Sequence, residues 1–251
     1  MVSYTYQMPS GIAGNVNRVD SATIEQFILD QTTNTPTVFG VPVKNTSGKI
    51  RSIVAGDLSA SIIGFLVRPY PTSGNGTDGL GVAAPNKALP GDVLKRGYIS
   101  VAVGGTTAPV SNGTVYCRVG NASTGKVIGD IEAAPDIAVS AAATVGTGTQ
   151  TAGTLSALVT TPAGVYTVKM TSGSAFDVLD ANGAELLHNG VFATQYTLDN
   201  GLSFKMTTGG TPTLGDTTAI TVTQNTIVVP GNTYFTGGMD SSNNAEVAFN
   251  I

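Results

Sequence analysis

Four residues in the stretch GSAFDVLDANGAELLHNG are of the types found in calcium-binding loops: Asp177, Asp180, Asn182 and Gly183. A helix-loop-helix calcium site needs oxygen ligands at loop positions 1, 3 and 5, glycine at position 6 and a bidentate glutamate at position 12. With Gly183 at position 6, a valine occupies position 1 and Asn189 occupies position 12. The Asn-Gly pair between alternating apolar residues instead favours a two-residue type I′ turn. We therefore predict the tip of a β-hairpin here and no metal site.

Two glycine-rich stretches are similar to phosphate-binding loops. Residues 120–126, GNASTGK, come close to the P-loop pattern, but Val127 stands where a magnesium-binding Ser or Thr is needed. The residues that follow favour a strand, whereas a phosphate site needs a helix N-terminus. Residues 74–79 match GxGxxG but lack the strand-turn-helix context that gives this motif its meaning. We predict a tight turn for the first stretch and a loop for the second.

The chain has one histidine, His188, and one cysteine, Cys117, which lie far apart in the sequence. They offer no zinc-ligand spacing, and a Ser-His-Asp triad would have to use His188 in a turn region. Cys117 alternates with Tyr116 and Arg118, which indicates a small strand residue. No carboxylate lies in a recognisable catalytic motif. The sequence therefore predicts a non-enzymatic protein with no catalytic residues, no metal site and no cofactor.

Composition restricts the partners of this chain. Charged residues make up only 11% of the 251 residues, and the net charge is -4. No basic stripe is available for phosphate groups, so we expect no direct binding to nucleic acid. No apolar run is long enough to span a membrane. The first residues lack the pattern of a signal peptide, and a single cysteine offers no disulfide framework, so we expect the chain to stay in the cytosol where it is made.

The elements that position these residues are predicted to be strands. Turn residues such as Asn-Gly, Gly-Asp and Pro-Gly recur every eight to twelve residues or so, between short runs of β-branched and aromatic residues. This spacing is typical of antiparallel all-β folds. Residues 20–29, DSATIEQFIL, form the best helix candidate, but their β-branched residues favour a strand.

Breaks in composition divide the chain into segments. Residues 133–153 are small and almost uncharged, which indicates a linker. Residues 154–225 form a series of hairpins, and the strand-like residues 226–251 are too short to make a domain alone. We therefore expect residues 226–251 to complete a first domain over 19–132, and residues 154–225 to form an inserted small domain. Residues 1–18 are predicted to form an extended N-terminal arm.

Several stretches resemble the structural cement and capsid decoration proteins of tailed bacteriophages. These stretches are VFGVPVKN (38–45), GFLVRPYP (64–71), PGDVLKRGYISVAV (90–103), VYCRVG (115–120) and NTYFTGGMDSSNNAEVAFNI (232–251). Residues 164–222 also look like a small β module appended to phage head decoration proteins, with a D-x-x-G turn at 180–183 and a Gly-Asp pair at 215–216. The resemblance implies an antiparallel jelly-roll-like or barrel-like cement domain, with a small β-sandwich domain inserted near the C-terminus.

The resemblance also implies a virion protein on the outer surface of the capsid, bound to the phage major capsid protein and forming a homo-oligomer, either a dimer or a trimer. Arginine and aromatic residues beside strand ends, and those in the arm, are typical of interface hot spots. The candidate contacts are Tyr4, Tyr6, Met8, Arg68, Tyr70, Arg96 and Tyr98. An alternative is a receptor-binding or glycan-binding module of a phage tail fibre or baseplate. The absence of Trp from the sequence weighs against that alternative, because glycan sites use aromatic platforms.

Overall fold

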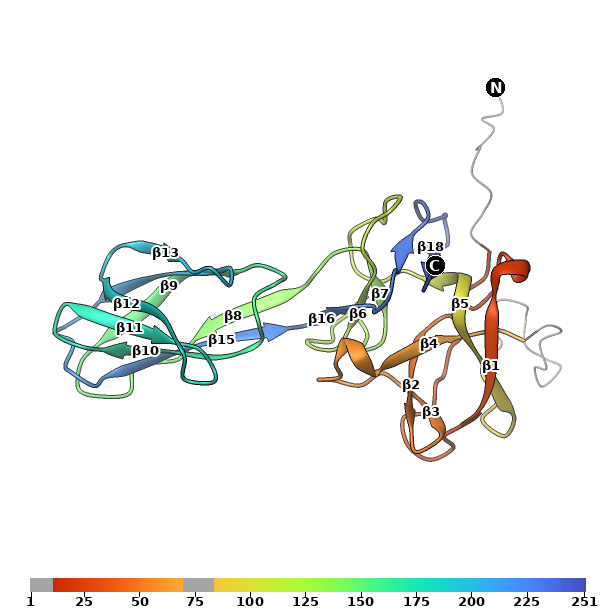
Figure 1. Cartoon of the computed structure of the whole chain (residues 1–251), viewed down its shortest axis with the longest axis horizontal. Coiled ribbons are helices and arrows are strands. Elements are labelled where there is room, and N and C mark those ends of the chain that lie inside the picture. Colours follow the sequence, from red (N-terminus) through yellow and green to blue (C-terminus); the bar gives the residue numbers. More distant parts are fainter. Residues whose placement is uncertain (1–10, 70–83) are drawn as a thin grey trace, which may run out of the picture. The chain divides into compact units, whose positions relative to one another are not determined.

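The computed structural model describes residues 11–69 and 84–251 and divides the chain into two compact units. Unit 1 consists of Met1–Pro135 and Thr226–Ile251, and unit 2 consists of Asp136–Asn225. In the described residues, regular structure other than strand is limited to two three-residue 3₁₀ turns. The all-β prediction is therefore confirmed (Figure 1).

Unit 1 contains a closed β-barrel. Its sheet runs in the order β1-β3-β2-β4-β5, and β1 also pairs with β5, which closes the ring. β1 and β3 are parallel, and the other neighbours in the ring are antiparallel. The ring strands are β1 (Thr23–Leu29), β2 (Pro42–Thr46), β3 (Lys49–Ser52), β4 (Ile62–Leu66) and β5 (Pro90–Ala102). Of the jelly-roll-like and barrel-like alternatives, the barrel is the one observed.

The sheet continues beyond the ring because β5 changes partner along its length. Its first half pairs with β1, and residues 97–102 pair with β18. Gly97 lies at this change with a φ of +135°, a backbone conformation that favours glycine. The remaining elements of unit 1 are η1 (Val19–Ser21), η2 (Ser59–Ser61), β6 (Tyr116–Arg118), β7 (Ile131–Glu132), β16 (Thr226–Val228), β17 (Tyr234–Phe235) and β18 (Asn244–Phe249).

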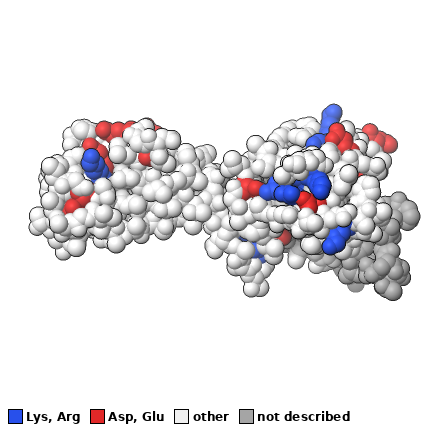
Figure 2. Space-filling view, turned by 90° about the horizontal axis from the view of Figure 1, so that it is seen from below, with Lys and Arg blue, Asp and Glu red and all other residues white. Residues whose placement is uncertain are grey.

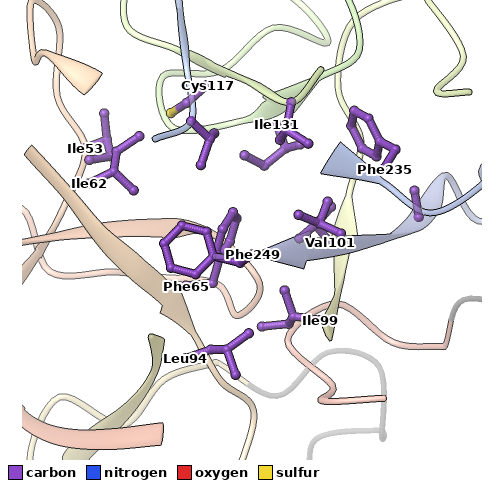
Figure 3. Packing of buried hydrophobic residues seen from close by; sticks show 14 of the residues in the cluster. Ile53, Ile62, Phe65, Leu94, Ile99, Val101, Cys117, Ile131, Phe235 and Phe249 are labelled. Carbon is purple, nitrogen blue, oxygen red and sulfur yellow. The ribbon is translucent and has the colours of Figure 1, made fainter. Parts of the chain in front are cut away.

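Two apolar clusters fill unit 1. Each of the five ring strands contributes one buried side chain to the barrel interior: Leu29, Val43, Ile50, Leu66 and Val93. A larger cluster joins the extended sheet to the smaller sheet β16-β6-β7. In that cluster the rings of Phe65 and Phe249 meet edge to face, with centroids 5.2 Å apart (Figure 3). Phe249 comes from the last strand, so residues near the C-terminus lie in the core of unit 1.

Unit 2 is built from two sheets that share one core. The five-stranded sheet has the order β12-β11-β10-β15-β8, and the three-stranded sheet has the order β13-β14-β9. Both sheets contribute buried residues to one cluster, including Tyr166 and Phe176 from the first and Phe204 and Met206 from the second. The strands are β8 (Ile137–Ala141), β9 (Gln150–Ala157), β10 (Gly164–Met170), β11 (Ala175–Leu179), β12 (Glu185–Val191), β13 (Gln195–Thr197), β14 (Leu202–Thr208) and β15 (Thr217–Gln224).

The structure corrects the linker expected over residues 133–153. β8 lies in that range and pairs with β15, and β9 begins in it and pairs with β14. Small residues can pair in this way because hydrogen bonds between strands use only the backbone. Asp216 also organises the range, because its carboxylate accepts backbone N–H bonds from Thr147 and Gly148 at 3.0 and 2.8 Å.

Candidate functional site

The described part of the predicted N-terminal arm is bound to the barrel. The backbone N–H of Gly14 donates to the carbonyl oxygen of Ser100 at 2.8 Å, and the N–H of Ser100 donates to the carbonyl of Asn15 at 2.9 Å. Asn17 N–H donates in the same way to the carbonyl of Tyr98 at 3.1 Å. Residues 11–18, the described part of the extended arm expected over residues 1–18, therefore belong to unit 1.

Two glycines allow this segment to lie close to the barrel. Gly14 and Gly40 have φ angles of +87° and +76°, in the left-handed region. A Cβ atom on Gly14 would lie 2.5 Å from Cβ of Phe39, and a Cβ atom on Gly40 would lie 2.6 Å from the backbone nitrogen of Gly14. Each position therefore needs glycine for its space as well as for its backbone conformation.

Arg68, a candidate contact, also holds the N-terminal segment. Its backbone N–H donates to the carbonyl of Gly14 at 2.8 Å, and its Nε donates to the carbonyl of Ala13 at 3.2 Å. The guanidinium carbon lies 4.9 Å from the centre of the Phe39 ring. Burial lowers the pKa of the Arg68 guanidinium from its ordinary value. The side chain thus fixes the segment to the barrel.

A cavity of about 470 Å³ lies beside Arg68 and is also lined by Phe39, Asp130 and Ile131. Burial raises the pKa of the Asp130 carboxyl, and the negative charge of Glu132 acts in the same direction. A backbone hydrogen bond from Val127 opposes both effects. The cavity walls therefore carry the Arg68 guanidinium and the Asp130 carboxyl group, and burial makes that carboxyl harder to ionise.

Tyr98 lies in a small polar cluster on the β5-β18 part of the sheet. The guanidinium carbon of Arg18 lies 3.9 Å from the centre of the Tyr98 ring, and Arg18 forms an ion pair of 2.9 Å with Glu246. Glu246 also accepts hydrogen bonds from the side chains of Asn17 at 2.9 Å and Thr236 at 2.8 Å. The cluster joins the N-terminal segment to the C-terminal strand β18, and one ring face of Tyr98 is already covered.

The structure thus brings Arg68 and Tyr98 to the same N-terminal segment, while Arg96 is exposed on β5 opposite Thr23 of β1. The other candidate contacts lie outside the described residues: Tyr4, Tyr6, Met8 and Tyr70. Sequence reasoning missed Arg18 and Glu246. These two residues are 228 positions apart, and no local pattern could have paired them.

The glycine-rich stretch at residues 120–126 forms the tight turn predicted for it. Ser123 and Lys126 exchange two backbone hydrogen bonds of 2.9 Å each. The carbonyl of Gly120 accepts a bond of 2.9 Å from the Arg118 guanidinium. A phosphate site needs converging N–H donors, whereas this stretch directs a carbonyl oxygen at an arginine. The GxGxxG match at 74–79 lies outside the described residues.

The expected hairpin between β11 and β12 is also present, but its turn type differs. Gly183 has a φ of +83°, whereas Asn182 keeps a negative φ, and the connection spans residues 181–183. The Asp180 carboxylate accepts N–H bonds from Asn182 and Ala184, both at 2.8 Å. This aspartate cap favours a three-residue turn with one left-handed glycine over the two-residue type I′ turn.

Charge is sparse on the face of the molecule seen in Figure 2, where most of the described surface carries neither sign. Within residues 11–69 and 84–251, no helix is long and apolar enough to cross a membrane. Most of the polar side chains described above bond to other segments of the chain itself.

Comparison with known proteins identifies the family. The family model described as XM1 gp53 minor capsid protein matches residues 1–172. This match covers more than two thirds of the 251 residues, and the chain belongs to that family. It is therefore a structural protein of the phage capsid.

Two further comparisons add no argument. No curated protein matches the chain. Among solved structures, the crystal structure of Xanthomonas campestris FlgL is similar at 15% identity, with a TM-score of 0.29. The alignment covers 81% of this chain and 49% of the FlgL chain, so this chain spans about half the length of that structure. A TM-score this low does not establish a shared fold.

Proposed function

We propose that this minor capsid protein binds the outer surface of the assembled capsid and bridges adjacent subunits of the major capsid protein. The observation that carries the proposal is the family match over residues 1–172, which includes the whole barrel ring of unit 1. The charge-poor surface supports it, because a surface with few ions loses little hydration energy when an interface covers it.

Selective binding to the assembled state explains how such a protein stabilises a shell. A protein that binds only the lattice stabilises it by RT ln(1 + [L]/Kd), or about 2.7 kcal/mol per site at a hundredfold excess over Kd. A second contact on a neighbouring subunit adds avidity, because it forms at a high effective concentration. Repetition over the shell multiplies both effects.

We assign the contacts to two parts of unit 1. Arg96 is an exposed side chain on β5, and its guanidinium suits bonding to a partner's carboxylates or carbonyls. Tyr4, Tyr6 and Met8 lie outside the described residues and precede, in sequence, the segment 11–18 that is bound to the barrel. The cluster of Arg18, Tyr98 and Glu246 is assigned to holding that segment in place.

Co-sedimentation of the purified chain with mature, undecorated heads tests the proposal. Unexpanded procapsids and free capsid subunits serve as controls. We expect saturable binding to mature heads alone, weakened by Arg96→Ala and by deletion of residues 1–10. Lys169→Ala is the matched control, because it removes an exposed charge from unit 2. Absence of binding to every form would reject the proposal and would direct work to a glycan array.

We also propose that the protein acts as a homo-oligomer, a dimer or a trimer, because capsid lattices present symmetric sites. Sedimentation equilibrium of the free chain at several concentrations gives the mass directly. A chain that is monomeric at all concentrations in solution, and that binds heads as single copies, would contradict the proposed oligomer but not the proposed binding to the capsid.

A further inference from the structure

Three possible metal ligands come together on the hairpin β11-β12 of unit 2. Among residues 11–69 and 84–251, Asp177, Glu185 and His188 place one ligand atom each within 4.8 Å of one another. The Nδ1 atom of His188 lies 3.2 Å from Oδ1 of Asp177 and 3.1 Å from Oε1 of Glu185. All three side chains lie away from the buried core of the sandwich.

Two irregularities of β12 create this group. Glu185 and His188 are three positions apart, and in a regular strand they would point to opposite faces. The pairs Val178↔Leu187 and Leu179↔Glu185 leave Leu186 as an extra residue, which restores both side chains to one face. A second extra residue follows, because His188 and Asn189 together lie opposite the single residue 177. β-Bulges often redirect side chains in this way beside functional sites.

Two of the three distances within the group are close to those of a tetrahedral metal centre. Zinc binds imidazole nitrogen and carboxylate oxygen at about 2.0–2.2 Å, so neighbouring ligand atoms of a tetrahedron lie about 3.3–3.6 Å apart. The separations of His188 Nδ1 from Asp177 Oδ1 (3.2 Å) and from Glu185 Oε1 (3.1 Å) are slightly shorter than this range. The backbone N–H of Asn189 also donates to Oδ1 of Asp177 at 2.9 Å, which holds the carboxylate in its present orientation.

The donor atoms of the group suit a divalent cation. Nδ1 of His188 can carry one proton, and a single N–H cannot satisfy two carboxylates equally. Two carboxylates and one imidazole also converge on a chain in which only 11% of residues are charged. Lys169 is the cross-strand neighbour of Asp177 and the nearest candidate for a competing cation on this sheet. A divalent ion would balance both carboxylates and use all three donor atoms.

We propose that Asp177, Glu185 and His188 bind one divalent transition-metal ion of the zinc type, through two oxygens and one nitrogen. This donor set suits zinc better than calcium, which takes six to eight oxygen ligands. The His188 side chain is 63% exposed, so the fourth coordination position opens to solvent. A water molecule, or a donor group from another protein, fits there. The proposal departs from the sequence-based expectation of no metal site and does not depend on capsid binding.

Isothermal titration of the full, untagged chain with Zn²⁺ tests the proposal after removal of metals by a chelator. We expect one Zn²⁺ per chain, and Co²⁺ in its place should give the intense visible absorption of a tetrahedral site. His188→Gln and Asp177→Asn should each weaken binding more than about tenfold, since loss of outer-shell partners alone costs 10–100-fold. Asp199→Asn, an exposed carboxylate of the same unit, should leave the affinity unchanged.

Two results would overturn the proposal. One is absence of a one-to-one Zn²⁺ isotherm in the parent chain. The other is equal affinity in the parent, His188→Gln and Asp177→Asn, which would place the ion elsewhere. Far-UV circular dichroism of each variant checks that the sandwich is folded, so that lost binding reports lost ligands. Lys169→Met provides an independent test, because removing the competing cation should strengthen binding and should not weaken it.

Discussion

A buried ion pair in unit 1 leads to a quantitative prediction about its stability. Arg118 of β6 is fully buried, and Glu132 of β7 is 4% exposed. The Arg118 guanidinium donates from Nε and Nη2 to the two carboxylate oxygens of Glu132, with a distance of 2.9 Å for Nη2. Its Nη1 donates to the carbonyl of Gly120 at 2.9 Å. One side chain therefore joins β7 to the turn that follows β6.

Arg118→Met keeps a long side chain but leaves the Glu132 carboxylate buried without its partner. Breaking a buried pair in this way costs about 3–5 kcal/mol, because the remaining charge is uncompensated. The double variant Arg118→Met/Glu132→Leu removes that charge as well. It retains the cost of the Gly120 and Asn121 carbonyls that lose the Arg118 donor, about 1–3 kcal/mol for a buried acceptor left unsatisfied. We therefore expect the double variant to be more stable than the single variant.

Cys117 provides an assay confined to unit 1. It is the only cysteine in the sequence, it is fully buried, and burial raises the pKa of its thiol far above the usual range. Labelling by a thiol reagent therefore requires unit 1 to open. At 1.36 kcal/mol per tenfold change, a loss of 3–5 kcal/mol makes labelling about 150 to 5,000 times faster.

Arg18→Met is the control, because it breaks the exposed ion pair with Glu246. Such an ion pair contributes about 0–1 kcal/mol, and the cation-π contact of Arg18 with Tyr98, which is also lost, contributes about 0.5–1 kcal/mol. Labelling should therefore accelerate less than about thirtyfold. The reasoning fails if Arg118→Met labels no faster than Arg18→Met. It also fails if the double variant labels as fast as the single one. Circular dichroism before labelling confirms that each variant starts folded.

Two further predictions concern the units and acid. Removing residues 136–225 should leave a chain that melts cooperatively and protects Cys117 from labelling. Removing residues 226–251, which include the fully buried Val247 of β18, should abolish both properties. The opposite pattern in thermal melts would refute the division of the chain into these two units. In unit 2, three backbone N–H donors lower the pKa of the Asp216 carboxyl below its ordinary value of 3.8, although burial opposes this shift. The stabilisation that ionised Asp216 provides is therefore present above pH 3.8 and is lost as the pH falls through the lower pKa of the folded state. Asp216→Asn should thus flatten the dependence of the unit 2 melting temperature on pH below about 4. An equal slope in the parent chain and the variant would contradict this prediction.

Local features of this fold could be predicted from the sequence because local chemistry determines them. The segment DSATIEQFIL favours a strand through its β-branched residues, and β1 covers Thr23–Leu29 after a short 3₁₀ turn. The turn at residues 120–126 follows from its glycines. The closure of the barrel through β1 and β5 has no such signal, because it pairs Thr23 with Arg96 across a long stretch of chain.

The N-terminal segment shows why glycine can mislead a local interpretation. Near a chain end, Gly11 and Gly14 are typical of an extended arm. In the structure, Gly14 lies against Gly40 because neither residue has a Cβ atom to keep the two backbones apart. Glycine has no side chain, which makes an isolated segment flexible but also lets two backbones pack closely against each other. Only the position of the partner, 26 residues later in the sequence, distinguishes the two outcomes.

The ligand group on unit 2 could not be predicted from the sequence for a related reason. The alternation rule for strands separates Glu185 from His188, and a loop-type calcium pattern instead draws attention to Asp180 and Asn182. In the structure, the Asp180 carboxylate accepts hydrogen bonds within its own turn, and Asp177, which belongs to the strand before it, joins the histidine. The extra residues in β12 are the reason that Asp177, and not Asp180, lies beside His188. A deletion of Leu186 should therefore leave Glu185 and His188 two positions apart on one face of a regular strand and retain zinc binding, while the Asp180 turn remains intact. Loss of one-to-one binding in that variant would show that a shared strand face alone does not assemble the ligands.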